Sequence, residues 1–258
     1  SLELIADIIQ NPSFPDGEFT RLQKERLTSL RRIKDDPTAL AERLVSGLFY
    51  GATSPYGHPI FGTEPSLESI NKENLVNQFK QYFNPKNATM IVVGDISLEK
   101  VIKEAERFLG DWATNLELPE IVEPDGTPFP SVPNTIYILD KPDAAQSVIR
   151  AGHAIAGRNH PSYYPYSVLN HAFGGQFTAR LNMNLRQDKG YSYGYNSSIG
   201  WSKQSSILIA GGSVQTAVTK EAVIETLSEF RGIHHERPIN TDEFLAAKSA
   251  LLRNFPSR

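Results

Sequence analysis

The run from Leu181 to Gly194 constrains the fold most, because its period changes from helical to strand-like within a few residues. Apolar side chains recur at helical intervals up to Leu185, and tyrosines then alternate with small residues, as on a strand. Because of this change of period, we expect the side chains of Arg186 and Tyr193 to lie close together, although seven positions separate them in the sequence. A guanidinium and a phenol placed in this way can donate hydrogen bonds to one acceptor, such as a peptide carbonyl.

Periodicity along the rest of the chain predicts helices interleaved with strands. Helices are expected at 2–10, 17–34, 38–50, 72–83, 97–109, 162–173, 177–186, 219–231 and 241–253. Strands are expected at 134–140, 146–153, 191–200 and 205–213, and Met90–Gly94 reads as a further, buried strand. Asp36 and Pro37 are predicted to end one helix and open the next, since proline in the first turn needs no amide hydrogen. The fold class is therefore α+β, with layers of helices on a mostly antiparallel sheet.

Composition excludes several classes of function. The chain has 258 residues, enough for a sizeable core, and a formal net charge of only −3. That charge balance argues against electrostatic binding to nucleic acid or to an anionic membrane. No apolar run approaches the roughly 20 residues that span a bilayer. The absence of cysteine excludes disulfides and thiolate metal sites without identifying the compartment, for which the periplasm or cytoplasm of a bacterium is the expectation.

Several motifs resemble one known family. The stretch from His171 to Gly194 contains a Gly-Gly pair, a helix ending in Leu-Arg and a strand with tyrosine. It resembles the second-domain signature of the M16 (pitrilysin, insulinase and processing-peptidase) family of metallopeptidases. Further segments resemble, in order, the back half of that family's first domain: Leu4–Pro15, Phe49–Gly51, Pro55–Thr63, Ser66–Leu67 and Asn84–Asp95.

The resemblance implies two partial domains. Residues 1–115 would form the back half of the first M16-like domain, and residues 134–258 would form the front half of the second, which carries Arg186 and Tyr193. The proline- and acid-rich stretch 116–133 between them is predicted to be a linker. Because the sequence begins inside a predicted helix without an initiating Met, we expect it to be part of a longer protein.

The zinc chemistry of the family can be tested on individual residues. Active members carry His-x-x-Glu-His on one helix, but no two of the six histidines here are four positions apart. The family also places two acids, one of them a zinc ligand, on the helix after Phe14, where this chain has Leu22 and Ser29. Neither side chain offers a carboxylate. Glu25 could replace Ser29 only in a shifted alignment, and its basic neighbours favour a surface ion pair instead. The resemblance thus implies no metal or cofactor in this chain, and zinc in a partner subunit or in sequence upstream of Ser1.

The resemblance further implies a non-catalytic type of subunit, inactive alone. Such a subunit would bind a peptide or unfolded polypeptide and pair with a zinc-bearing M16-type partner or with a second copy. Arg186 and Tyr193 would bind the substrate at the partner's zinc centre, and an unpaired strand edge near Ser192–Gly200 would hold its backbone. Two alternatives remain open. The protein could be an active zinc metalloendopeptidase with an upstream His-x-x-Glu-His, or a structural core-type subunit without a catalytic role.

Overall fold

The computed structural model describes residues 2–112, 117 and 135–254, which form two compact units. Unit 1 comprises Ser1–Arg31 and Gly62–Glu123, and unit 2 comprises Arg32–Phe61 and Pro124–Arg258. Apart from residue 117, the predicted linker 116–133 lies outside the described residues. The division into two partial family domains therefore stays a prediction, while the structure assigns the segment 32–61 to the second compact unit.

In the described part of unit 1, all regular secondary structure is helical. The helices are α1 (Leu2–Gln10), α2 (Asp16–Ile33, whose last two residues belong to unit 2), α4 (Glu64–Ser69), α5 (Lys72–Tyr82), the 3₁₀-helix η2 (Pro85–Asn87) and α6 (Leu98–Leu109). α1 packs on α6, where the Gln10 side chain donates to the Phe108 carbonyl at 2.9 Å. Gln23 on α2 donates to the Leu67 carbonyl at 2.7 Å and so ties α2 to the end of α4. The structure confirms the helices predicted at 2–10, 17–34, 72–83 and 97–109. It adds α4, which was not predicted.

The predicted buried strand Met90–Gly94 is wrong for this structure. The segment has no strand pairing, and the side chains of Ile91 and Val93 are 83% and 94% exposed. The strand predicted at 134–140 is likewise absent over 135–140, and Ile138 is 87% exposed. Both runs have the apolar, β-branched composition of strands, but a strand also needs a neighbour for its amide and carbonyl groups. Within the described residues neither segment has one.

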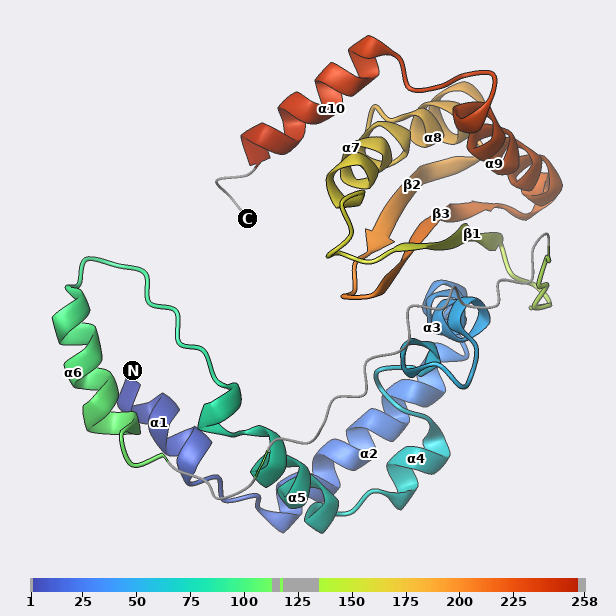
Figure 1. The fold of residues 1–258 in the computed structure, drawn as a ribbon. Helices are drawn as coiled ribbons and strands as arrows, with labels where there is room; N and C mark the ends of the chain where they lie inside the picture. The colour runs from blue at the N-terminus through green and yellow to red at the C-terminus, as the bar shows by residue number, and fades with distance from the viewer. Residues whose placement is uncertain (1, 113–116, 118–134, 255–258) are drawn as a thin grey trace. The chain divides into compact units, whose positions relative to one another are not determined.

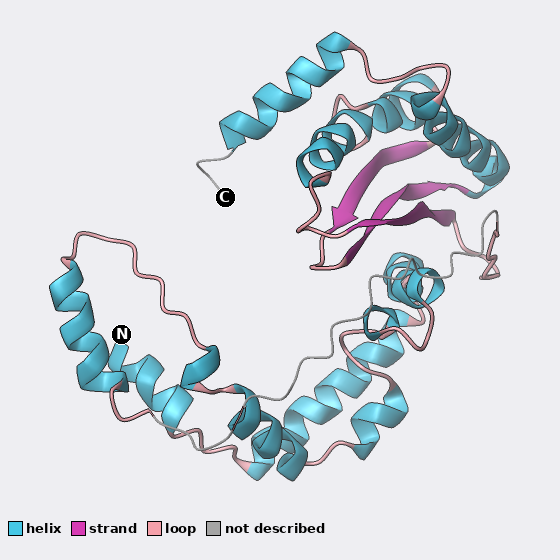
Figure 2. Ribbon diagram, in the orientation of Figure 1, coloured by secondary structure: helices cyan, strands magenta, loops and turns pink. Residues whose placement is uncertain are grey.

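Unit 2 is built on a three-stranded antiparallel sheet with the order β1-β3-β2. The strands are β1 (Gln146–Ala156), β2 (Ser192–Gly200) and β3 (Ser205–Gln215). β3 is the central strand, and its register places Ala210 opposite Ala151 on β1 and Ser197 on β2. Figure 2 shows the three strands in magenta. The predicted β2–β3 hairpin is therefore confirmed, and so is the α+β class with helices on an antiparallel sheet.

Helices cover both faces of this sheet (Figure 1). The helices of unit 2 are α3 (Pro37–Tyr50), α7 (Tyr163–Phe173), α8 (Arg180–Asn182), α9 (Thr219–His234) and α10 (Thr241–Asn254), with short turns η1 (Pro55–Gly57) and η4 (Thr216–Val218). The side chains of alternate residues of β3 point to opposite faces of the sheet. Ala210 and Val214 pack with α7, α8 and α9, whereas Ile207 packs with Val45 and Tyr50 of α3. No helix in the described ranges has the length and apolar character needed to cross a bilayer.

Candidate functional site

The predicted helix 177–186 is replaced by a short α-helix and a π-helix. After α8, the chain forms the π-helix η3 (Met183–Asp188), in which the Lys189 amide donates to the Asn184 carbonyl at 3.0 Å. Leu185 within η3 has no exposed surface and packs in the main core of unit 2. A π-helix is rare and is frequently found at functional sites. Here the next residue after the buried Leu185 is Arg186.

Arg186 lies against an aromatic ring. Its guanidinium carbon is 4.4 Å from the centre of the Phe177 ring, which is 63% exposed. A guanidinium held over a ring in this way keeps its in-plane N–H donors directed outward while one face is covered. Phe177 therefore restricts the orientation of Arg186 without using its hydrogen-bonding capacity.

Tyr193 projects from a β-bulge at the start of β2. Ser192 pairs with Val214 and Tyr195 with Gly212, so three steps on β2 face two steps on β3. A bulge of this kind redirects a side chain, and Tyr193 is 92% exposed. The Ser192 hydroxyl supports the bulge by accepting from the Gly194 amide at 3.1 Å and lying 2.7 Å from the Ser213 carbonyl.

The neighbouring Tyr195 has a structural role instead. It is fully buried, and its hydroxyl lies 2.7 Å from the Thr226 hydroxyl on α9. Burial raises the pKa of Tyr195 to about 12, because the phenolate would lose its hydration. Strand β2 thus exposes Tyr193 to solvent and buries Tyr195.

Arg186 and Tyr193 come from elements that pack together, since η3 contacts β2. No hydrogen bond, ion pair or cation–π contact joins the two side chains in the part of the chain that the structure describes. Their assignment as substrate-binding residues stays a prediction, but the geometry gives both of them surface positions with unused donors.

The expectation of an unpaired edge along β2 needs correction. β2 lies at the edge of the sheet, but two of its outward amides already have partners from the preceding helical segment. The Tyr195 amide donates to the Asn182 side chain at 3.1 Å, and the Ser197 amide donates to the Gly174 carbonyl at 3.0 Å. At these positions the edge is closed to a peptide strand.

The Gly174-Gly175 pair allows close backbone packing. A Cβ atom on Gly174 would lie 2.5 Å from the Ser197 amide nitrogen and 2.8 Å from Leu181 Cδ1. The absence of a side chain at position 174 therefore lets the turn after α7 approach the edge of β2.

We expect Gly174→Ala to lower the free energy of unfolding by about 1–3 kcal/mol, the usual cost of an overpacked core position. The new methyl group would push the turn away from Ser197 and break the amide-to-carbonyl bond described above. Gly200→Ala is the matched control, because a Cβ there meets nothing within 4 Å. Urea denaturation of both variants checks the prediction, and equal midpoints for the two would contradict it.

A partly buried polar network connects the π-helix to α9. Asn184 donates to Glu225 at 3.1 Å and to Glu229 at 2.8 Å, and Glu229 also accepts from Arg237 at 3.2 Å. The hydrogen bond from Asn184 lowers the pKa of Glu225 below its ordinary value, although burial partly opposes this. Asn184 thereby anchors η3 to α9, two residues before Arg186.

The residues at the expected zinc-ligand positions do not fit a zinc ion. Leu22 on α2 is 54% exposed and has no ligand atom, and the Ser29 hydroxyl donates to the Glu25 carbonyl at 3.0 Å. The Glu25 carboxylate lies 3.0 Å from the Arg21 guanidinium, which confirms the predicted i,i+4 surface pair. No group of three His, Cys, Asp or Glu side chains suited to a metal occurs among the described residues. We therefore derive no zinc chemistry from this chain itself.

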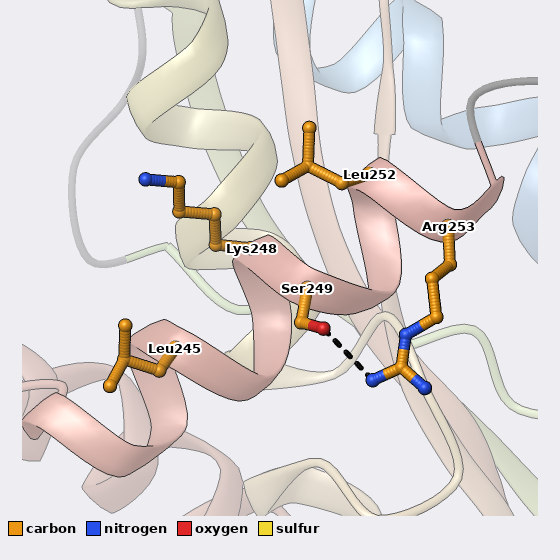
Figure 3. A pocket seen from close by; sticks show the side chains of 5 residues that line it. All are labelled: Leu245, Lys248, Ser249, Leu252 and Arg253. Atoms are coloured by element: carbon orange, nitrogen blue, oxygen red, sulfur yellow. Dashed lines mark hydrogen bonds between the residues drawn. The ribbon is translucent and has the colours of Figure 1, made fainter.

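One open hollow of about 370 Å³ lies along α10 and contains none of the predicted site residues. Figure 3 shows its five lining side chains, all from this one helix: Leu245, Lys248, Ser249, Leu252 and Arg253. Arg253 donates to the Ser249 hydroxyl at 2.8 Å, so the polar side chains partly satisfy each other. The hollow is the exposed face of a helix and does not bring chemistry from several elements together.

Phe177 and Asn182 belong to the site but were not predicted from the sequence. Phe177 reads as an ordinary apolar position of a helix, and only the structure places it under Arg186. Asn182 carried a weak signal, since an amide inside an apolar helical repeat needs buried partners.

Comparison with known proteins identifies the family. Residues 69–251 match the profile of a family described as "Peptidase M16 inactive domain". The chain belongs to the M16 peptidase family. Among its relatives, the "Uncharacterized zinc protease YmxG" of Bacillus subtilis is 28% identical over 239 residues, which cover 90% of this M16 chain and 55% of that protein. The "Probable mitochondrial-processing peptidase subunit beta" of Schizosaccharomyces pombe is 24% identical over 178 residues, covering 67% and 38%.

The fold is shared with a solved M16 structure. The crystal structure of a "peptidase M16 inactive domain" from Pseudomonas fluorescens matches with a TM-score of 0.83 at 21% identity, covering 97% of this M16 chain and 59% of that one. This M16 chain thus spans about half the length of the relatives that it matches.

Proposed function

We propose that this M16 chain is a peptide-binding subunit without a zinc centre of its own, which supplies Arg186 and Tyr193 to the zinc centre of a partner. The observation that carries the proposal is that two side chains with unused donors come from elements that pack together: the half-buried Arg186 over the Phe177 ring and the exposed Tyr193 on the bulge of β2. The match to a domain described as inactive supports it, and so does the lack of a carboxylate at positions 22 and 29.

The two side chains suit the recognition of a peptide carbonyl. A guanidinium offers several coplanar N–H donors and a phenol offers one O–H donor. Neither side chain donates to another group in the described ranges, so both remain available to a substrate. As an attacked carbonyl develops negative charge, preorganised donors of this kind stabilise it more strongly than they stabilise the ground state. Because Asn182 and Gly174 close much of the β2 edge, the substrate would be held here mainly through these side chains.

The partner that we propose is a zinc-bearing M16-type subunit, with a second copy of this chain as the other arrangement. One relative is itself named as a subunit, the probable mitochondrial-processing peptidase subunit beta of Schizosaccharomyces pombe. The substrate would be a peptide or an unfolded polypeptide, because the donors address backbone carbonyls, which every peptide carries.

A second candidate function is an active zinc peptidase in which the zinc motif belongs to the same polypeptide. The relative named as a zinc protease favours it, since this chain spans only 55% of that protein. Arg186 and Tyr193 would then act on a zinc centre in the same molecule. A purely structural subunit remains the third hypothesis.

We expect the purified chain to retain no stoichiometric zinc after dialysis and to cleave no peptide alone. Addition of a zinc-bearing M16 subunit from the same organism should produce hydrolysis above that of the added subunit by itself. Atomic absorption and a fluorogenic peptide assay measure the two properties. Stoichiometric zinc together with cleavage by the chain alone would establish the second candidate. An inert mixture that also binds no unfolded β-casein would favour the structural subunit.

A further inference from the structure

One buried side chain connects the segments that carry Arg186 and Tyr193. Asn182, at the end of α8, is only 6% exposed. Its amide nitrogen donates to the Phe177 carbonyl at 2.7 Å, and its amide oxygen accepts from the Tyr195 amide at 3.1 Å. The side chain uses both ends of its amide group, one toward the loop before α8 and one toward β2.

Each of these two partners lies next to one of the proposed substrate-binding residues. Phe177 supplies the ring over which Arg186 lies, at 4.4 Å. Tyr195 is the first residue of β2 after the bulge, where regular pairing with Gly212 resumes two positions beyond Tyr193. Asn182 therefore binds the backbone of Phe177, whose ring contacts Arg186, and the backbone of Tyr195, where the bulge ends.

We propose that Asn182 is a positioning residue, which fixes Arg186 and Tyr193 relative to each other. This inference rests on the function proposed above. A displacement of about 1 Å between substrate-binding groups can lower turnover by about 100-fold. A single amide that bridges both supports is thus expected to matter more for activity than its two hydrogen bonds matter for stability.

The edge of β2 has a second, independent attachment, which separates positioning from folding. The Ser197 amide donates to the Gly174 carbonyl at 3.0 Å, and the Ser197 hydroxyl donates to Asn170 at 2.8 Å. These bonds keep β2 against α7 when Asn182 is changed. A change of Asn182 removes only its hydrogen bonds with the Tyr195 amide, beside the bulge, and with the Phe177 carbonyl.

The test compares Asn182→Ala with Tyr195→Phe in the chain reconstituted with its zinc-bearing partner. Tyr195→Phe removes a buried hydrogen bond to Thr226 from the same strand without touching the backbone contacts of Asn182. Both variants should lower the melting temperature by similar amounts. Only Asn182→Ala should reduce kcat, by about 10- to 100-fold, and it should cause no further loss in an Arg186→Ala/Tyr193→Phe background. An equal loss in both backgrounds would show a merely structural role and overturn the proposal.

Asn182→Asp serves if Asn182→Ala does not fold. It keeps the shape of the side chain and the acceptor for the Tyr195 amide, and the ionised form lacks the donor to Phe177. It should show a loss of kcat that is again absent in the double-variant background. A wild-type kcat for Asn182→Asp, at the same melting temperature, would contradict a role for the Phe177 contact.

A spectroscopic measurement separates failure of this inference from failure of the proposed function. With 3-fluorotyrosine at position 193, the ¹⁹F resonance should shift or broaden in Asn182→Ala and stay unchanged in Tyr195→Phe. If the Arg186→Ala/Tyr193→Phe variant has wild-type kinetics, the proposed function fails, and the ¹⁹F spectrum alone decides whether Asn182 positions Tyr193. An unchanged resonance in Asn182→Ala would overturn the positioning role in either case.

Discussion

Replacement of Arg186 by Ala, or of Tyr193 by Phe, is expected to lower kcat of the reconstituted peptidase by about 10- to 1,000-fold, the range for losing one donor to a developing oxyanion. Tyr193 is 92% exposed, and the side chain of the half-buried Arg186 contacts the Phe177 ring and makes no hydrogen bond or ion pair among the described residues. Protein stability should change far less than activity, because a surface guanidinium and one phenolic hydroxyl contribute only about 1 kcal/mol to folding.

Matched controls for this experiment exist elsewhere in unit 2. Arg158 likewise lies over a ring, with its guanidinium carbon 4.0 Å from the centre of Tyr163, and Tyr164 is a tyrosine that is 75% exposed. Arg158→Ala and Tyr164→Phe should leave steady-state kinetics on an unstructured peptide unchanged. A loss confined to KM in the Arg186 and Tyr193 variants would indicate uniform binding of the peptide. Wild-type kinetics in both would leave the structural subunit as the stronger hypothesis.

Leu185→Ala is expected to lower the free energy of unfolding by about 2–5 kcal/mol, the cost of a cavity at a fully buried leucine. Leu185 has no exposed surface and packs in one cluster with residues from α7, α8, α9 and both strands of the hairpin: Phe173, Leu181, Tyr195, Ala210, Val214 and Ala222. Its removal would open a void between the helices and the sheet, directly before Arg186.

Met183→Ala is the matched control on the same π-helix, because Met183 is 37% exposed and lies outside this cluster. Urea denaturation followed by circular dichroism measures both variants. The control should lose much less stability than Leu185→Ala. If Leu185→Ala cost less than about 1 kcal/mol, the site could collapse around the missing side chain, and the core described here would not determine the position of η3.

Local signals in the sequence predicted most of the helices and the hairpin. Asp36 accepts from the amides of Thr38 and Ala39 at 2.9 and 3.1 Å and caps α3, as its place before Pro37 indicated. Such caps act within one turn, so a sequence pattern can report them. Alternation of tyrosine and small residues likewise predicted the strand β2, although the bulge leaves Tyr193 exposed and Tyr195 buried.

Features that depend on contacts between distant segments could not be predicted in this way. The run around Ile91 has strand composition, but whether it pairs depends on a neighbour that composition does not reveal. The two bonds of Asn182 join loop, helix and strand, and the bulge at Tyr193 exists only in the register with β3. The change of period singled out Arg186 and Tyr193 and the family resemblance implied their role, whereas the groups that orient them required the structure.

The π-helix also sets a limit on changes of length in this part of the chain. A π-turn accommodates one residue more than the α-helical turn that it replaces, so the direction of Arg186 is determined by backbone register as well as by side-chain rotamer. Deletion of one residue between Asn182 and Arg186 would leave too few residues for the i→i+5 hydrogen bonding of this segment and would favour an ordinary α-helical turn in its place. Natural variation at this site should therefore alter residue types far more readily than the number of residues between Asn182 and the bulge.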